Sequence, residues 1–340
     1  MPQRPRLTPA VADVRRAVRV ALPPEGLVLV ALSGGPDSLA LAAATAFEAP
    51  RTGLQAGAVV VDHGLQDGSD AVAERAASQA CELGLDPVEV VRVAVSTSST
   101  DGLEAAARDA RYAALDAAAI HHGATHVLLG HTLDDQAETV LLGLGRGSGP
   151  TSLQGMAPEN GRYLRPLLGI RRSTTVQACV DAGLTPWTDP HNSNPAFTRV
   201  RVRTTVLPLL EQELGPGVAE ALARTAEQLR EDADALDHMA EEVAEELVEL
   251  EEAGLSLGVA ALAANPAALR QRLIRLVVAS EFHVAISRTQ TLEVARLVTD
   301  WHGQGSLDLP GLRVERRGGR IHFVSSEVGP LTGNKPPAEH

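Results

Sequence analysis

The sequence predicts an α/β protein in which a doubly wound, mostly parallel sheet is followed by a smaller, mostly helical C-terminal domain ending in a β-hairpin. Short apolar segments of strand length alternate with longer helical segments in the first part of the chain. A glycine-rich loop follows the first strand, and two strand-like segments near the end flank Gly318-Gly319. Such alternation is typical of a parallel sheet covered by helices, and a Gly-Gly pair favours a two-residue hairpin turn.

The elements of the first part follow from their apolar patterns. Strands are expected at four runs rich in valine and leucine: Leu27–Leu32, Ala58–Val61, Val88–Val93 and His126–Leu129. A helix is expected after each strand: from about Asp37, through Ala71–Leu83, near Leu103–Ile120 and from about Asp134. Ligands of doubly wound sheets bind outside the carboxyl ends of the strands. The polar segments that follow these strands are therefore the candidate functional residues.

The second part is expected to be less regular. The glycine-rich segment 143–150 is typical of a loop, and a mixed segment continues to about Leu210. Residues 211–253 form an acidic helical stretch, whose charges we interpret as a solvated helix face. The expected hairpin pairs Leu312–Arg317 with Arg320–Val324. We expect a first domain at residues 1–215, a second at residues 216–328, and a disordered tail at residues 329–340.

Composition restricts the class of protein. A chain of 340 residues suits two or three domains, and 44% hydrophobic with 21% charged residues is typical of globular proteins. No apolar run is long enough to span a membrane, and the first residues lack a signal-peptide core, so we expect a cytoplasmic protein with no membrane partner. The net charge of −13 argues against a general nucleic-acid binder, although arginines gather locally. The oligomeric state stays open, a homodimer included.

The two cysteines, Cys81 and Cys179, lie far apart in the sequence and form no CxxC pair. This spacing argues against a zinc ribbon and against an iron–sulfur site. We expect both side chains to be small, buried hydrophobic groups.

The most informative segment follows the first strand and consists of Ser33, Gly34, Gly35, Pro36, Asp37 and Ser38. Two glycines let the backbone turn sharply and approach a ligand closely, and N–H groups at a helix N-terminus bind anions. The segment predicts a site for nucleotide phosphates, with Asp37 able to hold a metal ion. It lacks the lysine of the common P-loop, since the only lysine of the chain is Lys335. An ordinary glycine-rich turn is the alternative.

Two other sites are open to a purely structural explanation. Asp62 and His63 follow the second strand and could contact a nucleotide or a base, but an Asp-His pair at a strand end more often serves a turn. Arg108 and Arg111 lie at i, i+3 on one helix face, where two guanidinium groups could hold a phosphate or a carboxylate. A solvated arginine pair matched with neighbouring acids is the alternative.

A denser polar cluster follows the fourth strand and contains His131, Asp134, Asp135 and Glu138. Asp134 and Asp135 open the expected helix, where carboxylates interact favourably with the helix dipole. Asp134 and Glu138 lie at i, i+4 and are expected to point the same way, so they could bind Mg²⁺ or a substrate ammonium group. Helix capping explains Asp134 alone but not the whole group, so we predict a functional site.

Several arginines form a candidate surface for a polyanion. Arg146 lies between glycines, as in a loop that closes over phosphates; a plain linker is the alternative. Arg199, Arg201 and Arg203 alternate as on one face of an extended segment. The same surface would include Arg162, Arg165, Arg171, Arg172, Arg313, Arg316, Arg317 and Arg320. Phosphate contacts of this kind predict salt-sensitive binding, although each arginine singly could be an ordinary solvated residue.

These segments together resemble one family. The phosphate segment resembles the loop of the N-type ATP pyrophosphatases, which have the adenine nucleotide alpha hydrolase-like fold and cleave ATP between the α- and β-phosphates. SGGPDS, VDHGL, EAAARDARY, GHTLDDQAET, RGSG with LQGM, and RPLL occur here together and in order. In that combination the chain resembles the tRNA(Ile)-lysidine synthetases, over about residues 27–215. It departs from the family pattern at Gln66 and Val200, where members often carry arginine and asparagine.

The resemblance implies a ligase that joins L-lysine to C2 of the wobble cytidine of tRNA(Ile) with a CAU anticodon. ATP would adenylate O2 of the base and release pyrophosphate; the lysine amine would then attack C2 and release AMP. The implied cofactors are ATP, as a substrate, and Mg²⁺. Residues 33–38 would bind ATP, with Asp62, His63 and His131 close to the nucleotide.

The remaining roles also follow from the resemblance. Asp37 and Asp134 are the candidate Mg²⁺ ligands. The candidate catalytic residues are Asp37, Arg108, Arg111, Asp134, Asp135 and Glu138. The candidate tRNA-binding residues are Arg146, Arg199, Arg201 and Arg203.

Two other classes of function remain open. Another pyrophosphatase would share the phosphate loop; a tRNA thiolation enzyme would usually need paired cysteines, and GMP or NAD synthetases would lack the other segments. A nucleotide-binding module that senses ATP without turnover belongs to a different class. Such a module would bind ATP but release no pyrophosphate, and the clustered carboxylates argue against it.

Overall fold

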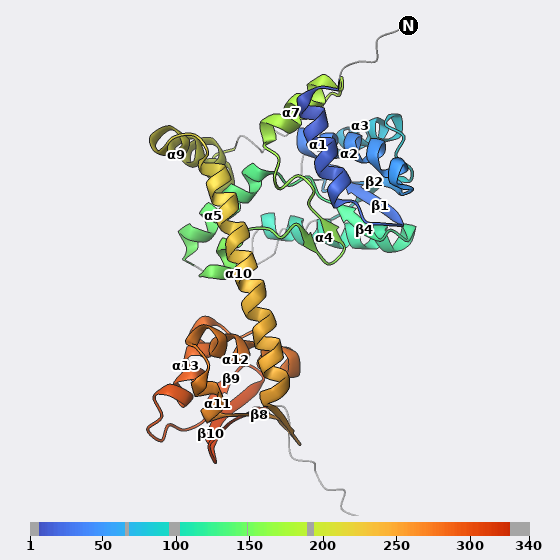
Figure 1. The fold of residues 1–340 in the computed structure, drawn as a ribbon. Helices are drawn as coiled ribbons and strands as arrows, with labels where there is room; N and C mark the ends of the chain where they lie inside the picture. Colours follow the sequence, from blue (N-terminus) through green and yellow to red (C-terminus); the bar gives the residue numbers. More distant parts are fainter. Residues whose placement is uncertain (1–6, 65–67, 95–102, 148, 189–193, 327–340) are drawn as a thin grey trace, which may run out of the picture. The chain divides into compact units, whose positions relative to one another are not determined.

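The computed structural model describes residues 7–64, 68–94, 103–147, 149–188 and 194–326. The chain divides into two compact units, Met1–Arg230 and Glu231–His340 (Figure 1). The domain boundary expected between residues 215 and 216 lies just before helix α10 (Val218–Leu247), whereas the two units divide inside that helix. The expected tail, residues 329–340, lies outside the described residues.

The first unit is built on a six-stranded sheet of order β3-β2-β1-β4-β6-β5. Its strands are β1 (Leu27–Ala31), β2 (Gln55–Asp62), β3 (Val88–Arg92), β4 (His126–Leu128), β5 (Glu159–Asn160) and β6 (Tyr163–Leu164). Every neighbouring pair is parallel except β5 and β6. This arrangement confirms the predicted doubly wound, mostly parallel sheet. The strand order reverses between β1 and β4, which is where such sheets bind ligands.

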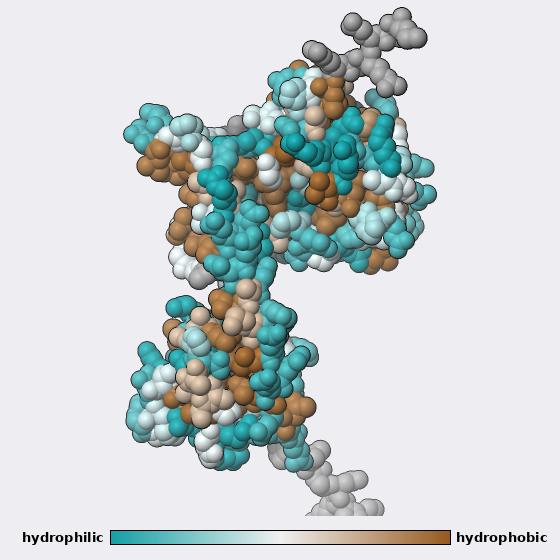
Figure 2. Space-filling model, viewed as in Figure 1, coloured by the Kyte–Doolittle hydropathy of each residue, from teal (hydrophilic) through white to brown (hydrophobic). Residues whose placement is uncertain are grey.

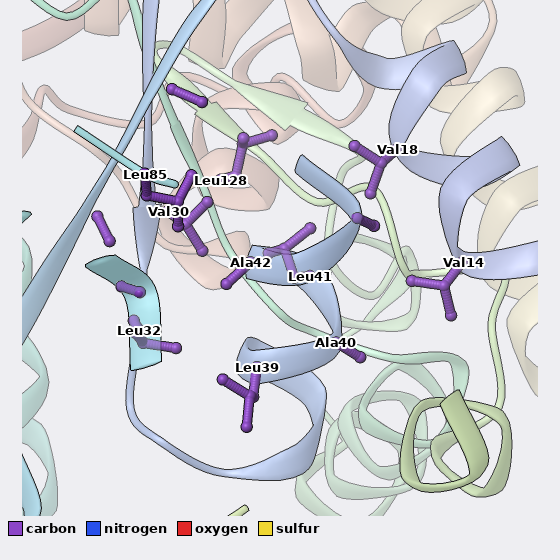
Figure 3. Close-up of a cluster of buried hydrophobic side chains, with 14 of the residues drawn as sticks. Val14, Val18, Val30, Leu32, Leu39, Ala40, Leu41, Ala42, Leu85 and Leu128 are labelled. Carbon is purple, nitrogen blue, oxygen red and sulfur yellow. The ribbon is translucent and has the colours of Figure 1, made fainter. Parts of the chain in front are cut away.

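Helices cover both faces of this sheet, which explains why its central strands β1 and β2 are mostly apolar and buried. Val28 and Val30 of β1 belong to a core that also contains residues of α1, α2, α3 and α7. Leu29, between them, belongs to a second core with Leu115 of α4. Figure 3 shows the first core, where side chains of α2 lie between Val30 and the valines of α1.

The helices of this unit confirm the expected alternation. They are α1 (Pro9–Ala21), α2 (Pro36–Glu48), α3 (Ser69–Glu82), α4 (Leu103–His122), α5 (Leu133–Arg146), α6 (Pro150–Leu153), α7 (Arg172–Asp181), α8 (Thr198–Arg201) and α9 (Leu207–Leu214). A 3₁₀ turn, η1 (Ala49–Thr52), and a π-helical turn, η3 (Val202–Val206), complete it. The first helix, α1, precedes every element that the sequence predicts.

Helix α1 is attached to α2 through a buried carboxylate. The side chain of Glu48, at the end of α2, is 1% exposed and accepts hydrogen bonds from Arg15 (2.8 Å) and Arg19 (2.7 Å) of α1. The hydrogen bond from Arg19 lowers the pKa of Glu48 to about 2, and Arg15 contributes in the same direction. The Glu48 carboxylate is therefore charged at ordinary pH and pairs with both guanidinium groups.

The loop expected at residues 143–150 is wrong for its first half, because α5 continues to Arg146. Gly147 then ends the helix with a φ of 65°, in the left-handed conformation that glycine adopts easily. Gly143 serves close packing: a Cβ there would lie 2.5 Å from the carbonyl oxygen of Ser152. These glycines are typical loop residues, yet one packs inside a helix and the other ends it.

The second unit contains more strands than the sequence predicts. Its five strands are antiparallel, in the order β7-β8-β11-β10-β9. They are β7 (Val248–Glu251), β8 (Gly254–Gly258), β9 (Leu307–Leu309), β10 (Leu312–Arg317) and β11 (Arg320–Ser325). The helices are α11 (Val259–Ala264), α12 (Ala267–Phe282) and α13 (Arg288–Thr299). The hairpin of β10 and β11 around Gly318-Gly319 is confirmed.

The acidic stretch expected to be helical over residues 211–253 is helical in α9 and α10 but not after Leu247, where β7 begins. Its glutamates, such as Glu241 and Glu245, are exposed, as a solvated face requires. Figure 2 shows hydrophilic residues along α10. Among the described residues, no helix is both long and apolar enough to cross a membrane.

Candidate active site

The phosphate loop, residues Ser33–Ser38, connects β1 to α2 at the carboxyl edge of the sheet. Its backbone turns at Gly34, which has a φ of 79°. The hydroxyl group of Ser38 accepts a hydrogen bond from the Ser33 N–H (3.1 Å), lies 3.0 Å from the Ser33 hydroxyl, and donates to the Gly35 carbonyl (3.1 Å). The loop is thus internally hydrogen-bonded, with α2 beginning at Pro36 directly behind it.

Helix α7 and the segment after it hold this loop from one side. Thr175 Oγ1 donates to one oxygen of Asp37, and Arg172 Nε donates to the other at 3.3 Å. One turn further along α7, Cys179 Sγ donates to the Pro36 carbonyl at 3.3 Å. The Trp187 N–H donates to the Gly34 carbonyl at 2.8 Å. Four contacts from residues 172–187 therefore fix a loop that lies 135 or more residues earlier in the chain.

The environment of Asp37 influences its titration. Burial raises the pKa of Asp37, and the hydrogen bonds from Thr175 and Arg172 oppose this only in part. Burial also raises the pKa of Cys179 to about 12, with the nearby Asp37 charge adding to it. The Cys179 thiol is therefore protonated at ordinary pH, as expected of a buried cysteine. The other cysteine, Cys81, is exposed, so the expectation that both are buried is wrong for Cys81.

Helix α5 carries the predicted acidic residues, and its first turn is closed by a capping box. The N–H and the hydroxyl of Thr132 both donate to Asp135 Oδ2 at 2.8 Å. Asp134 lies on another side and accepts from Arg171 Nη1 (3.2 Å) and from the Arg172 N–H (2.8 Å). Glu138 is completely buried. The expectation that Asp134 and Glu138 point the same way is wrong, because the side chains of Arg172 and Arg203 contact Asp135 and Glu138, while Asp134 accepts from Arg171 and from the Arg172 backbone.

Three arginines surround Asp135 and Glu138. Arg203 donates to Glu138 through Nε (2.7 Å) and Nη2 (3.0 Å), and Arg199 donates through Nε (3.0 Å). Arg172 donates to Glu138 through Nη1 (3.2 Å) and to Asp135 through Nη2 (2.8 Å). We call these six residues the ion cluster: Asp37, Asp135, Glu138, Arg172, Arg199 and Arg203. Its three carboxylates and three guanidinium groups balance in formal charge.

The residues of the ion cluster keep one another ionised, although they are largely removed from water. Burial alone would raise the pKa of Asp135, but Arg172, the Thr132 hydrogen bonds and Arg199 together lower it. Burial alone would lower the pKa of Arg172, but the carboxylates of Asp135, Glu138 and Asp37 together raise it. Both groups are therefore charged at neutral pH, which is what a stable buried ion pair requires.

The prediction of an extended segment at Arg199, Arg201 and Arg203 is wrong. Residues 198–201 form α8, and the π-helical turn η3 follows directly. Residues four apart lie on the same side of a helix, so Arg199 and Arg203 both reach α5. Arg201 points elsewhere and donates to the carbonyls of Pro195 (2.7 Å) and Ala196 (2.9 Å). Their assignment to tRNA binding stays a prediction.

The carboxylates named as candidate magnesium ligands already have hydrogen-bond donors on every oxygen. Thr175 and Arg172 donate hydrogen bonds to the two oxygens of Asp37. Arg171 and the Arg172 N–H donate to the two oxygens of Asp134. In the described part of the chain, no group of three or more histidine, cysteine, aspartate or glutamate residues is arranged to hold a metal ion. The residues therefore do not fit a preformed metal centre, and a role of Asp37 and Asp134 toward Mg²⁺ stays a prediction.

Asp62, the last residue of β2, and His63, which follows it, have different surroundings. Asp62 accepts from the Gly64 N–H (2.9 Å) and from Arg92 (3.1 Å), as the structural explanation requires. His63 and His131 each have a buried Nδ1 atom without a hydrogen-bond partner among the described residues. Burial lowers the pKa of both, to about 3 for His131, and Arg111 adds to the effect for each. Both rings are neutral at pH 7 and have a nitrogen available for a ligand.

The other predicted arginines differ in their surroundings. The guanidinium carbons of Arg108 and Arg111 lie 5.1 and 5.7 Å from the centre of the Tyr112 ring, and burial lowers the pKa of Arg111. Arg146 is exposed in the last turn of α5. Arg165, predicted on the surface, is buried and donates to the Ala157 carbonyl at 2.8 Å.

Sequence reasoning missed several of the residues that contact the site. Arg172 was grouped with the surface arginines, while Thr175 and Cys179 carried no signal as ligands of the loop. Gln136, inside the GHTLDDQAET segment, donates to the Met156 carbonyl (2.9 Å) and accepts from the Met156 N–H (2.6 Å). Gly155 is the sequence feature that permits these two hydrogen bonds, because a Cβ at that position would lie 2.5 Å from Gln136 Oε1.

Comparison with known proteins agrees with this geometry. The profile of the PP-loop domain matches residues 11–210, and that of the TilS substrate binding domain matches residues 257–322. The tRNA(Ile)-lysidine synthase of Leifsonia xyli subsp. xyli is 64% identical over 89% of this chain and 91% of its own length. The proteins of the same name from Thermobifida fusca and Streptomyces coelicolor are 54% and 56% identical, over 94% and 88% of this chain and 98% and 86% of their own lengths.

A solved structure shares the fold. The U34-tRNA thiolase NcsA from Methanococcus maripaludis, with its [4Fe-4S] cluster, superposes with a TM-score of 0.54 at 19% identity. The match covers 65% of this chain and 80% of the thiolase chain. At that identity the likeness concerns the fold alone, and it confirms the predicted sheet architecture. The family profiles and the curated relatives show more: this chain belongs to the tRNA(Ile)-lysidine synthase family of PP-loop proteins.

Proposed function

We propose that this protein uses ATP to attach L-lysine to C2 of the wobble cytidine of tRNA(Ile) with a CAU anticodon. ATP first adenylates O2 of the base, forming an oxygen–phosphorus bond and releasing pyrophosphate. The amine of lysine then attacks C2, loses a proton, and displaces AMP. The observation that carries the proposal is the joining of a phosphate loop to a buried acidic helix in a chain whose relatives bear this name.

The phosphate loop supports the first step. Its hydroxyl groups and the N-terminus of α2 suit the phosphates of ATP, and positioning and charge stabilisation account for most catalysis of phosphoryl chemistry. Mg²⁺ would enter bound to the ATP phosphates, since this ion usually keeps several waters and takes few protein ligands. His63 and His131, with neutral rings and unsatisfied nitrogens, are suited to hydrogen bonds with the nucleotide or the base.

Asp135 and Glu138 support the second step. Their oxygens accept only from guanidinium groups and capping donors, so the ammonium group of lysine would replace one guanidinium group and keep the charge balanced. Arg108 and Arg111 would then contact a phosphate or the lysine carboxylate. Arg146 and Arg201 are the predicted tRNA contacts that lie outside the ion cluster. A tRNA substrate favours a cytoplasmic reaction, which is part of the proposal. A homodimer is also proposed, and sedimentation of the purified protein tests it.

The cysteine content favours this proposal over thiolation. The thiolase neighbour carries a [4Fe-4S] cluster, whereas the present sequence has two cysteines in all, one exposed and one buried. Iron–sulfur clusters are held by several cysteine thiolates. A nucleotide sensor without turnover remains the alternative from another class, and pyrophosphate release distinguishes it.

The test is pyrophosphate release from the purified protein with ATP, Mg²⁺ and lysine. We expect release, and lysine incorporation, with isoleucine tRNA bearing a CAU anticodon but not with the methionine tRNA that shares this anticodon. Asp37→Ala should lower release by at least about 100-fold, because it removes a carboxylate at the phosphate loop, while leaving the circular dichroism spectrum unchanged. Full activity of the variant would exclude Asp37 from the reaction. No release with either tRNA would favour the sensor.

A further inference from the structure

One side chain of the ion cluster belongs to both halves of the site. Arg172 donates through Nε to Asp37 of the phosphate loop at 3.3 Å. Through Nη1 and Nη2 it donates to Glu138 (3.2 Å) and Asp135 (2.8 Å) of α5. Each of its three nitrogens thus contacts a different carboxylate. Among the three arginines of the ion cluster, only Arg172 pairs with both the phosphate loop and α5, since Arg199 and Arg203 pair, within the described residues, only with α5.

The orientation of this guanidinium group is fixed at both ends. Arg172 is the first residue of α7, and its N–H donates to Asp134 at 2.8 Å, which ties its backbone to α5 as well. Thr175, one turn later, donates to the other oxygen of Asp37. The Arg172 side chain is 22% exposed and that of Glu138 is not exposed at all. Because these charges are poorly solvated, moving one of them strongly affects its partners.

We propose that Arg172 is a positioning residue that transmits ATP binding from the phosphate loop to α5 and thereby sets Asp135 and Glu138 for the second substrate. This inference rests on the proposed function. Phosphate oxygens arriving at the loop attract the guanidinium group and compete with Asp37 for it. A guanidinium group is planar and rigid, so a shift toward the phosphates changes the two hydrogen bonds to α5 at the same time.

The geometry demands arginine and not merely a positive charge. A lysine ammonium group presents its three donors from one compact atom, whereas a guanidinium group presents donors along a fork. Lysine at position 172 therefore keeps the charge but cannot span Asp37, Asp135 and Glu138 together. The conservative substitution separates the transmission of ATP binding from simple neutralisation of the acids.

The direct test measures hydrogen exchange of the α5 amides, residues 133–146, with and without ATP and Mg²⁺, in the absence of tRNA and lysine. In the unmodified protein we expect ATP to change exchange in α5. In Arg172→Lys and Arg172→Met, at ATP concentrations shown by calorimetry to saturate the site, the change should fall to less than about half. The matched control is Arg16→Met, which removes an exposed arginine paired with Asp13 on α1 and should respond normally.

An α5 response of normal size in both Arg172 variants, or none in the unmodified protein, would overturn the inference. If Arg172→Met unfolds, Arg172→Lys still decides, since it retains the charge. In the lysidine assay, Arg172→Lys should raise KM for lysine by about tenfold, the equivalent of one charge-assisted hydrogen bond, with a smaller change in KM for ATP. The exchange experiment needs only ATP, so an unmodified protein that fails to make lysidine would disprove the proposed function separately.

Discussion

Individual residues of the site are constrained by how closely they pack. Gly130, which follows β4, lies against the backbone of the phosphate loop: a Cβ there would be 3.1 Å from Cα and N of Ser38 and 3.2 Å from the carbonyl carbon of Asp37. These neighbours are backbone atoms, so they cannot move aside as a flexible side chain would. The glycine therefore lets the segment after β4 approach the first turn of α2 closely, at the edge of the sheet where the ligand is expected.

A substitution at this position should damage ATP binding more than folding. In Gly130→Ala the loop must shift by a few tenths of an ångström, and we expect ATP affinity to fall by about tenfold, measured by calorimetry. The control is Gly145→Ala in α5, where a Cβ meets nothing within 4 Å; it should leave affinity unchanged and stabilise the helix by up to about 1 kcal/mol. Equal ATP affinity in the two variants would show that the contact with Ser38 is unimportant.

At the scale of elements, helices support the site from a distance. Helix α7 holds the phosphate loop, and α1 packs in turn against α2 and α7 through the core residues Val14 and Val18. The pair of arginines on Glu48 adds a charged contact between α1 and α2. The ring of Phe47 lies between Arg15 and Arg51, whose guanidinium carbons are 3.0 and 3.3 Å from its centre. Stability of the first unit therefore depends on α1.

The Glu48 contact should make stability depend on pH in a defined window. The folded pKa of Glu48 is about 2, below its ordinary value of 4.5, so its stabilisation is present above pH 4.5 and is lost as the pH falls toward 2. Glu48→Gln should lower the free energy of unfolding by about 1 to 3 kcal/mol at pH 7, measured by urea denaturation. The difference from the unmodified protein should shrink between pH 4.5 and 2.

The control for this prediction is an exposed pair on the same helix. Asp13 pairs with Arg16 at 2.8 Å, and both side chains are exposed. Asp13→Asn should change stability by less than about 0.5 kcal/mol, since exposed ion pairs contribute little. A Glu48→Gln effect that stayed constant from pH 7 to 3 would show that the loss comes from packing and not from charge.

At the scale of the whole molecule, the two units have separate hydrophobic cores. The second unit packs Leu273, Ile274 and Phe323 in its own core. The chain carries a net charge of −13, yet β10 and β11 present several arginines. Arg317 is 73% exposed, whereas Arg316 donates to the Leu297 carbonyl at 2.8 Å and lies over the Trp301 ring. Arg317 is therefore accessible to a ligand, whereas Arg316 contributes contacts within the second unit.

Binding of tRNA should distinguish these two arginines. If Arg317 contacts a phosphate, Arg317→Ala should weaken tRNA binding and reduce the slope of log affinity against log salt by about one, with thermal stability unchanged. Arg316→Ala should instead lower the melting temperature of the second unit, because it removes a hydrogen bond and a ring contact. Filter binding at several salt concentrations gives the slope. An unchanged slope in Arg317→Ala would remove the hairpin from the tRNA surface.

Much of the fold was predictable because it depends on local patterns. Strand-length apolar runs followed by amphipathic helices indicated the parallel sheet, and Gly318-Gly319 indicated the hairpin. The short strands of the second unit escaped detection: β9 has three residues, and β7 is the acidic segment Val248–Glu251, which looks like an extension of α10. Helical periodicity was also missed at Arg199 and Arg203, since alternation over five residues suits a strand equally well.

The candidate site was predictable in its residues but not in their pairing. The residues of the phosphate loop and the acidic residues of α5 were found because each short segment contains several polar or charged side chains next to a predicted strand. Their partners come from far along the chain: Arg172 lies 135 residues after Asp37 and 34 after Glu138. Nothing local distinguishes an arginine at a helix start that faces a carboxylate from one that faces water. Only the folded arrangement shows that the acids of α5 are matched with arginines.

The balanced ion cluster has a consequence for how the sequence can evolve. Removing one partner from a buried charged pair typically costs about 3 to 5 kcal/mol, whereas replacing both partners together can cost little. A change at Glu138 alone leaves three guanidinium groups short of an acceptor, and a change at Arg203 alone leaves Glu138 short of two hydrogen bonds. Substitutions at these positions are thus epistatic, and descendants of this protein should exchange them in compensating pairs or retain them all.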